Sequence, residues 1–297
     1  MKSLRFVLCI AAISVIAATA AQGQPNRTWV SHTGNDSNSC TAASPCLTFA
    51  AAYAKTAAGG EIDALDAGDF GPVTVTHAIT IDGGSNQLAT IFLGSSNTSG
   101  ITVSAGYSST VTLRNLSIHG TGLYNGQAGI NVASAQALHI EHCAMANVEY
   151  GLETSSFSTL VNIFIDDTVV RDSYIGLYLN GTSNISISGS RVLNNTFGLL
   201  TYGPSMNASI SNSDVSGNLY EGIYALYESN VFVANSTVTN NQGVGVYACG
   251  LSTLTLSSTS FYNNPNGAVA DCSGGVNSFK NNPITGEMAS TTTVPLQ

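Results

Sequence analysis

The sequence predicts an all-β parallel β-helix, a solenoid whose coils stack short strands into shared sheets. Its main sign is a glycine followed by a short apolar strand, which recurs with a period of roughly 23 residues, a repeat length typical of solenoids. A second strand recurs with the same period, and in it apolar and polar residues alternate until Asn, Ser, Asp or Gly interrupts the pattern. Alternation with period two indicates strands. The repeat glycines are Gly129, Gly151, Gly176, Gly198, Gly222, Gly245 and Gly267.

Residues 1–20 are predicted to be an export signal. Lys2 and Arg5 precede an apolar run over residues 6–16, and a small-x-small cleavage site follows at residues 18–20. The apolar run is too short to span a bilayer, and no other segment approaches 18 apolar residues. We therefore expect a secreted or periplasmic protein without a membrane span.

Residues 27–60 are predicted to form an N-terminal segment with a capping helix. Cys40 and Cys46 lie six residues apart and are expected to close a small loop. Ser44 followed by Pro45 is a helix start signal and Gly59-Gly60 is a stop signal, so a short helix is expected over residues 46–57. Such a helix would cover the open edge of the first coil, which otherwise invites another chain to pair. Its apolar face would consist of Leu47, Ala50, Ala51 and Ala54.

Residues 61–282 are predicted to form the β-helix itself, with roughly eight or nine coils. One coil cannot bury its own apolar face, so stability comes from stacking coils about 4.8 Å apart. Asparagines that lie one repeat period apart are expected to form a ladder in which each side chain bonds its neighbours. These are Asn195, Asn218, Asn241 and Asn264. Residues 283–297 lack the repeat pattern and are interpreted as a loose tail or an end cap.

Beyond the predicted signal, the remaining cysteines also follow the repeat. Cys249 and Cys272 lie one repeat period apart, which is one coil, so stacking would bring their Cα atoms near disulfide distance. Cys143 occupies a position that other coils fill with Ser or Thr. We expect it to be a buried free thiol and not a nucleophile.

The composition excludes some functions. The chain has eight basic and 17 acidic residues, a net charge of −9, and loss of Lys2 and Arg5 with the signal would leave −11. Nucleic acid binding needs a basic surface, and there is no lysine between Lys55 and Lys280. No nucleic acid partner is therefore expected. Hydrophobic residues make up 43% of the chain, which is enough to build a core and argues against disorder.

Residues 27–84, which begin RTWVSHTGNDSNSC and end THAITIDGG, resemble the opening of secreted bacterial right-handed parallel β-helix repeat proteins. Those proteins share the cysteine pair, the capping helix and the first coil. The repeats from Gly100 onward are similar to the pectin-lyase-like superfamily as a whole. The resemblance implies a right-handed β-helix with a carbohydrate-related role. Members of the superfamily include polysaccharide lyases, glycoside hydrolases, epimerases, esterases and surface binding proteins, so the shared fold does not assign an activity.

Charged side chains gather on three consecutive coils. Arg114, Glu141 and Asp166 share one outward position, and Asp167 takes the next position on the last of these coils. Carboxylates one or two coils apart would lie about 5 or 10 Å apart, which brackets the separations used by glycosidases. Alternatively, Glu141, Asp166 and Asp167 could hold calcium, which takes oxygen ligands. A third interpretation is a surface charge ladder, with an Arg114–Glu141 ion pair worth roughly 0–1 kcal/mol.

His139, Glu153 and Arg171 lie beside this patch and are candidate binding or catalytic residues. In pectate lyases the base is an arginine or lysine, so the resemblance would offer Arg171 or Arg114 for that role. No pectate lyase motif surrounds either arginine. Polygalacturonases carry a paired Asp before a Gly-His-Gly and an Arg-x-Lys, whereas here His119-Gly120 precedes the Asp pair and no Arg-x-Lys exists.

A file of tyrosines is the second candidate site. Tyr178, Tyr224 and Tyr247 each lie two residues after a repeat glycine and are expected to face outward. Aromatic faces on successive coils could stack on sugar rings. They could equally be surface tyrosines of ordinary β-propensity.

The leading hypothesis is noncatalytic binding of an extracellular or cell-surface polysaccharide, or a structural role at the surface. The competing hypothesis is a polysaccharide lyase or glycoside hydrolase that acts on acidic glycans through Glu141, Asp166, Asp167 and Arg171. The sequence leaves the glycan, the metal and the oligomeric state open.

Overall fold

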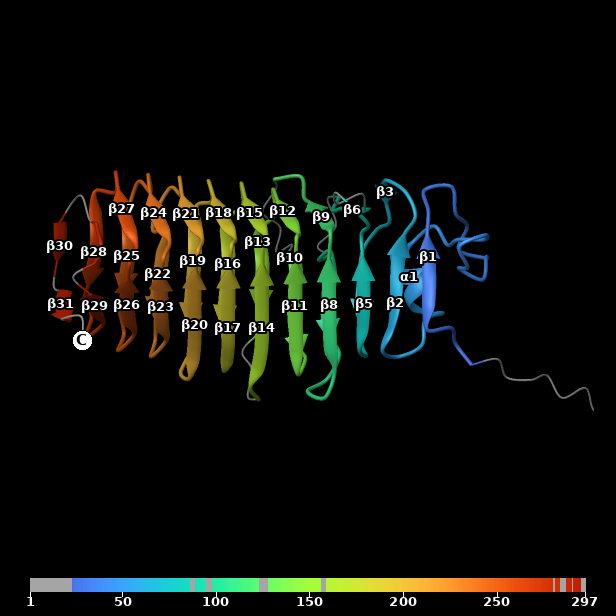
Figure 1. Cartoon of the computed structure of the whole chain (residues 1–297), viewed down its shortest axis with the longest axis horizontal. Coiled ribbons are helices and arrows are strands. Elements are labelled where there is room, and N and C mark those ends of the chain that lie inside the picture. Colours follow the sequence, from blue (N-terminus) through green and yellow to red (C-terminus); the bar gives the residue numbers. More distant parts are fainter. Residues whose placement is uncertain are drawn as a thin grey trace, which may run out of the picture.

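The chain forms a right-handed parallel β-helix. The computed structural model describes residues 23–85, 89–94, 98–122, 128–155, 159–279, 281–283, 287–289 and 291–294. Its coils stack side by side along one long axis, from the N-terminal segment at one end to the C-terminal strands at the other (Figure 1). The described strands form three parallel sheets of twelve, ten and nine strands, in agreement with the eight or nine coils predicted. The predicted signal, residues 1–20, lies outside the described residues.

The twelve-stranded sheet contributes the longest continuous surface. Its strands are β1 (Arg27–Val30), β2 (Gly60–Ala64), β5 (Ile79–Asp82), β8 (Thr110–Arg114), β11 (Ala137–Glu141), β14 (Val161–Asp166), β17 (Ser183–Ser188), β20 (Met206–Ser211), β23 (Asn230–Ala234), β26 (Thr253–Ser257), β29 (Gly275–Phe279) and β31 (Thr291–Val294).

Two further sheets complete each coil. The nine-stranded sheet holds β3 (Gly68–Asp69), β6 (Ala89–Phe92), β9 (Leu116–His119), β12 (Ala144–Ala146), β15 (Val169–Arg171), β18 (Arg191–Leu193), β21 (Asp214–Ser216), β24 (Thr237–Thr239) and β27 (Ser260–Tyr262). The ten-stranded sheet holds β4 (Val73–Val75), β7 (Ile101–Ser104), β10 (Ala128–Ser134), β13 (Tyr150–Thr154), β16 (Ile175–Asn180), β19 (Phe197–Tyr202), β22 (Ile223–Leu226), β25 (Val244–Ala248), β28 (Asn266–Ala270) and β30 (Glu287–Ala289).

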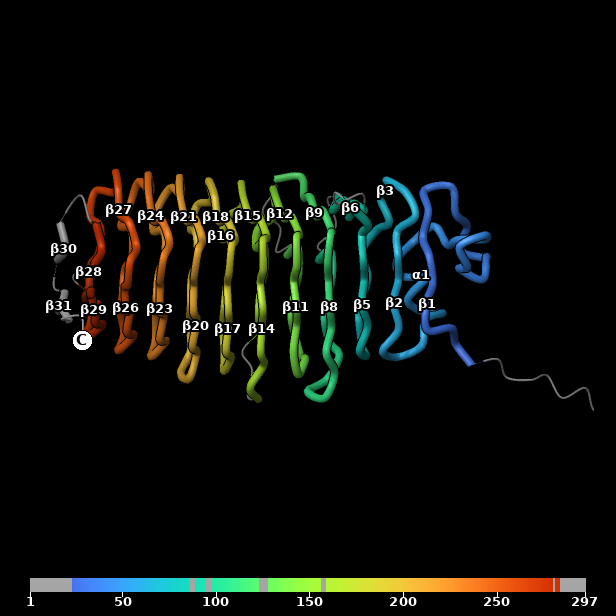
Figure 2. Tube along the Cα trace, in the orientation of Figure 1, coloured from blue at the N-terminus to red at the C-terminus, as the bar shows by residue number. Residues whose placement is uncertain are grey.

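Alternation along each strand sends every second side chain into the core. On β17, for example, Ile185 and Ile187 are buried while Asn184 is exposed. Residues one period apart are vertical neighbours, so each apolar position becomes a continuous buried column. Figure 2 shows how regularly the backbone repeats from coil to coil. Burial of these columns is the main driving force for folding, because each coil alone has no interior.

A single residue with left-handed backbone conformation makes the bend between the twelve-stranded and nine-stranded sheets. Asparagine, aspartate and glycine tolerate this conformation better than other residues do. Their φ values lie between 44° and 58° at Asn115, His142, Asp167, Gly189, Asn212, Asn235 and Ser258.

The predicted asparagine ladder is confirmed. Asn195, Asn218, Asn241 and Asn264 are buried at successive bends between the nine-stranded and ten-stranded sheets. The backbone N–H of each of the first three asparagines donates to Oδ1 of the next asparagine in the file, at 3.0 to 3.1 Å. Side-chain Nδ2 atoms donate along the same file at 2.8 to 3.3 Å. The ladder therefore satisfies polar groups that have no access to water.

The repeat glycines leave room for this ladder. A Cβ added to Gly198 would lie 2.4 Å from the carbonyl oxygen of Gly222 and 2.8 Å from Nδ2 of Asn218. The glycine is thus required by close packing, since any side chain would displace either the next coil or the amide file.

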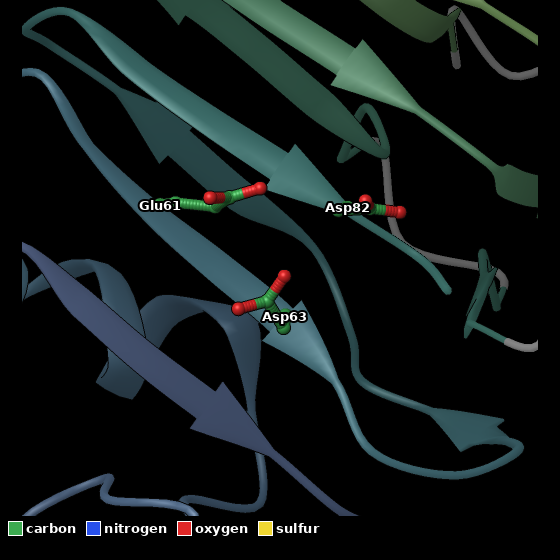
Figure 3. Close-up of side chains that lie close together, drawn as sticks. All are labelled: Glu61, Asp63 and Asp82. Atoms are coloured by element: carbon green, nitrogen blue, oxygen red, sulfur yellow. The ribbon is translucent and has the colours of Figure 1, made fainter. Parts of the chain in front are cut away.

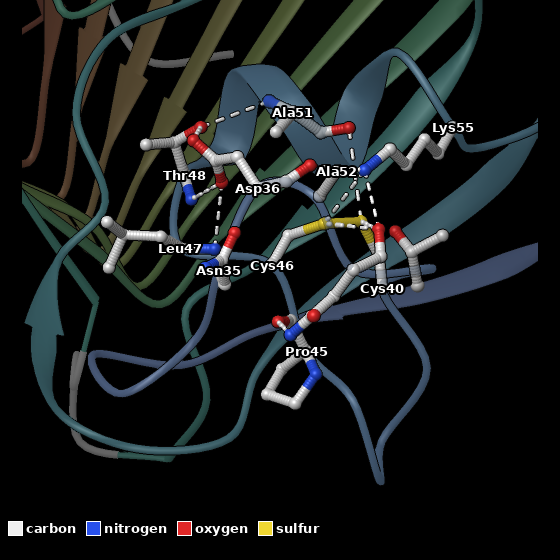
Figure 4. The surroundings of a disulfide bond; sticks show 12 residues. Asn35, Asp36, Cys40, Pro45, Cys46, Leu47, Thr48, Ala51, Ala52 and Lys55 are labelled. Atoms are coloured by element: carbon white, nitrogen blue, oxygen red, sulfur yellow. Dashed lines mark hydrogen bonds between the residues drawn. A yellow bond between two sulfur atoms is a disulfide. The ribbon is translucent and has the colours of Figure 1, made fainter.

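The Cys40–Cys46 disulfide closes the loop that borders β1, as predicted (Figure 4). The loop covers the free edge of the first strand. Trp29 donates its N–H to the carbonyl of Cys40 and accepts from the N–H of Cys46, and Ser31 donates to the carbonyl of Cys46. These backbone groups face away from β2 and would otherwise be open to another chain.

The predicted helix is shorter than expected, and it packs against β1 and against β4, the edge strand of the ten-stranded sheet. Helix α1 spans only Phe49–Tyr53 and is capped by the side chain of Thr48, not by Ser44. Asp36 accepts from the N–H groups of Leu47 and Thr48, which holds these residues outside the helix. The predicted apolar face is also wrong, because the buried residues of α1 are Phe49 and Ala52.

The solenoid extends further at both ends than the sequence predicts. At its start, β1 already pairs with β2, so the first strand begins at Arg27 and not at Glu61. Beyond residue 282, β30 and β31 pair with β28 and β29.

The second predicted disulfide, Cys249–Cys272, joins adjacent coils with Cα atoms 4.8 Å apart. Within the described ranges, no helix has the length and apolar character that crossing a membrane requires.

Candidate functional site

The outer face of the twelve-stranded sheet divides into a charged half and a neutral half. Each strand presents outward side chains at alternate positions, and the parallel register stacks them in columns. From β2 to β14, one of these columns carries Asp63, Asp82, Arg114, Glu141 and Asp166. From β17 onward, the same column carries only Ser188, Ser211, Ala234 and Ser257.

A hollow of about 520 Å³ lies on the neutral half, and we call it the outer hollow. Phe164 and Phe232 belong to one outward column and bound the hollow at two ends. Ser186 and Ser209 lie between them and are too small to fill the space. The two phenylalanines are three strand spacings apart, about 14 Å. The hollow therefore exists because two small side chains follow a large one.

A second asparagine ladder runs along the outer hollow. Asn162, Asn184, Asn207 and Asn230 occupy one outward column, and each Nδ2 donates to the preceding Oδ1 at 3.3 to 3.4 Å. These bonds are longer than most of those in the buried ladder, and the last three residues are exposed. An exposed amide retains a free N–H and free lone pairs after one such bond. The file therefore offers regularly spaced donors and acceptors to a ligand.

The outer hollow combines exposed aromatic rings with uncharged polar side chains. Phe164 and Phe232 are 37% and 40% exposed, unusually large fractions for phenylalanine. Among the described residues, those that line the hollow include no charged side chain. Flat rings with nearby amides and hydroxyls match a pyranose, which has apolar faces and a polar rim.

On the charged half, Arg114 does not form the pair with Glu141 that the charge-ladder interpretation expected. Its Nε bonds Asp82 at 2.8 Å, and its Nη2 bonds Glu61 at 2.6 Å. Burial alone would raise the pKa of Asp82, but hydrogen bonds from Asn115, the Gly84 N–H and Arg114 outweigh it and lower this pKa. The arginine is therefore fixed by the coils that precede it.

Three carboxylates lie close together, from Glu61, Asp63 and Asp82 (Figure 3), and Arg114 bonds two of them. One oxygen of each lies within 4.8 Å of the others. Arg27 pairs with Asp63, and Arg114 pairs with the other two, so two guanidinium groups already neutralise much of the charge. A cation at this place would compete with both arginines. The arrangement is consequently that of an ion-pair cluster.

The structure spreads the predicted catalytic residues over different surfaces. Glu141 and Asp166 are direct neighbours on the twelve-stranded sheet. Asp167 lies at the bend, with its carboxylate 3.6 Å from His142. Arg171 lies on β15 in the nine-stranded sheet, where it pairs with Asp172.

Other predicted residues have local partners. Glu153 belongs to the ten-stranded sheet and accepts a hydrogen bond from Asn131. His139 stacks on Phe164, which lines the outer hollow, with ring centroids 4.7 Å apart. Cys143 is fully buried, and this burial raises its pKa to about 12, which agrees with an inert thiol.

The tyrosine file has the predicted register on the ten-stranded sheet. Tyr178, Tyr224 and Tyr247 align in one column, but Leu200 interrupts it. Tyr224 and Tyr247 contact each other edge to face at 5.0 Å, and Tyr178 stacks on Tyr150 at 5.5 Å. All three are partly buried, and this burial raises their pKa values. The rings thus pack partly on one another, which reduces the area open to a ligand.

The outer hollow was not found from the sequence. Its asparagines recur once per repeat at the first outward position of the strand, and two phenylalanines with serines between them follow at the next. That spacing was visible, but a phenylalanine in a strand is ordinarily assigned to the core. Both rings face outward here because they fall on the polar phase of the alternation.

Comparisons with known proteins agree with this architecture. Residues 158–293 match the family model described as the right-handed beta helix region. A crystal structure of pectate lyase Pel9A superposes with a TM-score of 0.60 at 16% identity, covering 89% of this chain and 78% of that one. The likeness shows a shared fold.

Two alginate epimerases are more distant in structure. The periplasmic AlgG gives a TM-score of 0.39 at 13% identity, covering 80% of this chain and 77% of that one. The Azotobacter vinelandii mannuronan C-5 epimerase AlgE6 A-module gives 0.36 at 12% identity, covering 80% and 91%. No curated protein matches the sequence.

Proposed function

We propose that this protein binds an extracellular polysaccharide without cleaving it, and that the outer hollow is the contact surface. The observation that carries the proposal is an exposed amide ladder beside two outward phenylalanines on one parallel sheet. A repeating surface of this kind suits a repeating ligand, because successive sugars meet the same groups on successive coils. The predicted signal and the two disulfides support a secreted or periplasmic location.

The placement of charges favours binding over catalysis. Arg171 belongs to another sheet than Glu141 and Asp166, so the predicted set does not surround one substrate position. The competing hypothesis, hydrolysis or elimination on an acidic glycan, is favoured by one observation. The carboxylates of Glu141 and Asp166 are adjacent, and neither forms a hydrogen bond or ion pair with a described residue.

Binding and turnover are tested together on a panel of soluble polysaccharides. Phe232→Ala should weaken retention in affinity electrophoresis at least tenfold, because a stacked ring is lost. Phe92→Ala is the matched control, since Phe92 is 50% exposed on the nine-stranded sheet, away from the hollow. Equal losses in both variants would contradict the assignment of the site.

The same panel tests the enzyme. New reducing ends, or an unsaturated product that absorbs in the ultraviolet and disappears in Asp166→Ala, would replace the binding proposal. The tyrosine file is tested by Tyr224→Ala, which weakens retention only if that face also contacts the glycan.

A further inference from the structure

The outer hollow continues into an acidic platform. Phe164, which bounds the hollow, stacks on His139 with the ring planes 13° apart, so the aromatic surface extends one coil further towards the N-terminus. Asp166 lies two residues after Phe164 on the same strand, about 7 Å along it. Glu141 has the same relation to His139. Two carboxylates therefore border two stacked rings on one side.

No basic side chain of the described residues pairs with these two carboxylates. Among the residues that the structure describes, the side-chain carboxylates of Glu141 and Asp166 form no ion pair or hydrogen bond, although the backbone carbonyls of both residues accept hydrogen bonds. Arg114 senses the charge of Glu141, but its guanidinium is bonded to Glu61 and Asp82 on the opposite side. Like charges on adjacent strands repel each other, so the pair gains stability when a positive group approaches.

The outer face of the twelve-stranded sheet carries a net negative charge, like the pair Glu141 and Asp166. On the charged half, the carboxylates of Glu61, Asp63, Asp82, Glu141 and Asp166 outnumber the guanidinium groups of Arg27 and Arg114. An anionic polymer that leaves the hollow in this direction would meet net negative charge. A polymer with ammonium groups would be attracted.

We propose that the ligand of this face is a polysaccharide of amino sugars, with neutral rings in the outer hollow and free ammonium groups beside Glu141 and Asp166. This inference rests on the proposed function, because it names the class of glycan for the same surface. Sugar rings stack on Phe232, Phe164 and His139, and the amide ladder bonds their hydroxyl groups. The carboxylates then select unacetylated over acetylated sugars.

A matched pair of ligands tests this selection. The probes are an oligomer of β-1,4-linked glucosamine and its fully N-acetylated counterpart, which share a backbone and differ in charge. By calorimetry in slightly acidic buffer, we expect the charged oligomer to bind about fivefold more tightly, since exposed ion pairs are individually weak. The preference for the charged oligomer should disappear as the salt concentration is raised from about 0.01 M to 1 M, because the Debye length falls from about 30 Å to 3 Å.

Variants assign the preference to the two carboxylates. The double variant Glu141→Gln/Asp166→Asn should bind both oligomers equally, with affinity for the acetylated one unchanged. The control double variant Asp214→Asn/Glu221→Gln removes two charges outside the twelve-stranded sheet and should keep the fivefold preference.

The outcomes separate this inference from the proposed function. Equal binding of both oligomers by the native protein, with loss in Phe232→Ala, would refute the amino-sugar preference and leave the polysaccharide site standing. Binding of an oligogalacturonate that requires calcium and both carboxylates would also refute it. Failure of all these oligomers and of the polysaccharide panel to bind would remove the proposed function itself.

Discussion

Asn218 offers a direct test of how the solenoid is stabilised. Its Oδ1 accepts from the backbone N–H of Asn195 at 3.0 Å and from the Nδ2 of Asn195 at 3.3 Å, and its own Nδ2 donates to Asn241 at 2.8 Å. In Asn218→Ala, the backbone N–H of Asn195 loses its acceptor in a buried position. An unsatisfied buried group costs about 1–3 kcal/mol, and the space left by the amide adds to it. We expect a loss of about 3 kcal/mol in the free energy of unfolding.

Asn207→Ala is the matched control, because the exposed ladder has the same residue type and the same spacing. Its side chain makes two bonds of 3.4 Å at the surface, where water replaces them. We expect a change within about 0.5 kcal/mol, as is usual for exposed positions. The two variants therefore differ in burial and not in the kind of interaction removed.

Urea unfolding measures both variants. Far-ultraviolet circular dichroism follows the whole solenoid, and the fluorescence of Trp29, the one tryptophan of the chain, follows the first coil. Coincidence of the two transitions licenses a two-state free energy, and the shift in midpoint multiplied by the common slope gives its change. A loss at Asn218 no greater than that at Asn207 would refute the account of the buried ladder.

Three further predictions concern packing, reactivity and pH. Gly198→Ala should lower the unfolding midpoint strongly, since its Cβ would lie 2.4 Å from a carbonyl oxygen of the next coil, whereas Gly275→Ala has nothing within 4 Å and should be nearly neutral. The Cys143 thiol, whose pKa burial raises to about 12, should resist alkylation at pH 8 in the native protein and react fully in urea. The lowered pKa of Asp82 contributes stability that is present above the unfolded value of about 3.9 and is lost as the pH falls through the folded pKa. Asp82→Asn should therefore reduce the difference in melting temperature between pH 6 and pH 3, and a pH dependence equal to that of the native protein would contradict the role of the Arg114 pair.

The period of the sequence predicted those features that depend only on which residues become vertical neighbours. The buried asparagine ladder, the glycine file and the Cys249–Cys272 disulfide all follow from the repeat period. The pairing of Arg114 did not follow, because 32 residues separate it from Asp82. This coil is longer than the repeat period, so the period does not predict that Asp82 is the vertical neighbour of Arg114.

The start of the helix and the outer hollow could not be predicted from the sequence, for different reasons. The start signal at Ser44 was overridden by Asp36, a residue eleven positions before Leu47, whose carboxylate holds the following N–H groups outside the helix. The hollow depends on the volume missing at Ser186 and Ser209, and missing volume carries no sequence motif. Both features arise from contacts across the fold and not from local preference.

The loop that borders β1 has a consequence for where this chain matures. Stacked parallel coils resemble a short segment of the strand packing in amyloid fibrils, and such a stack stays short only if its terminal strand cannot pair with another chain. Here the loop that occupies the outer edge of β1 is closed by the covalent bond between Cys40 and Cys46. In an oxidising compartment this bond forms and the first coil ends the stack, whereas loss of the bond in a reducing compartment would free the edge of β1 for pairing with another chain.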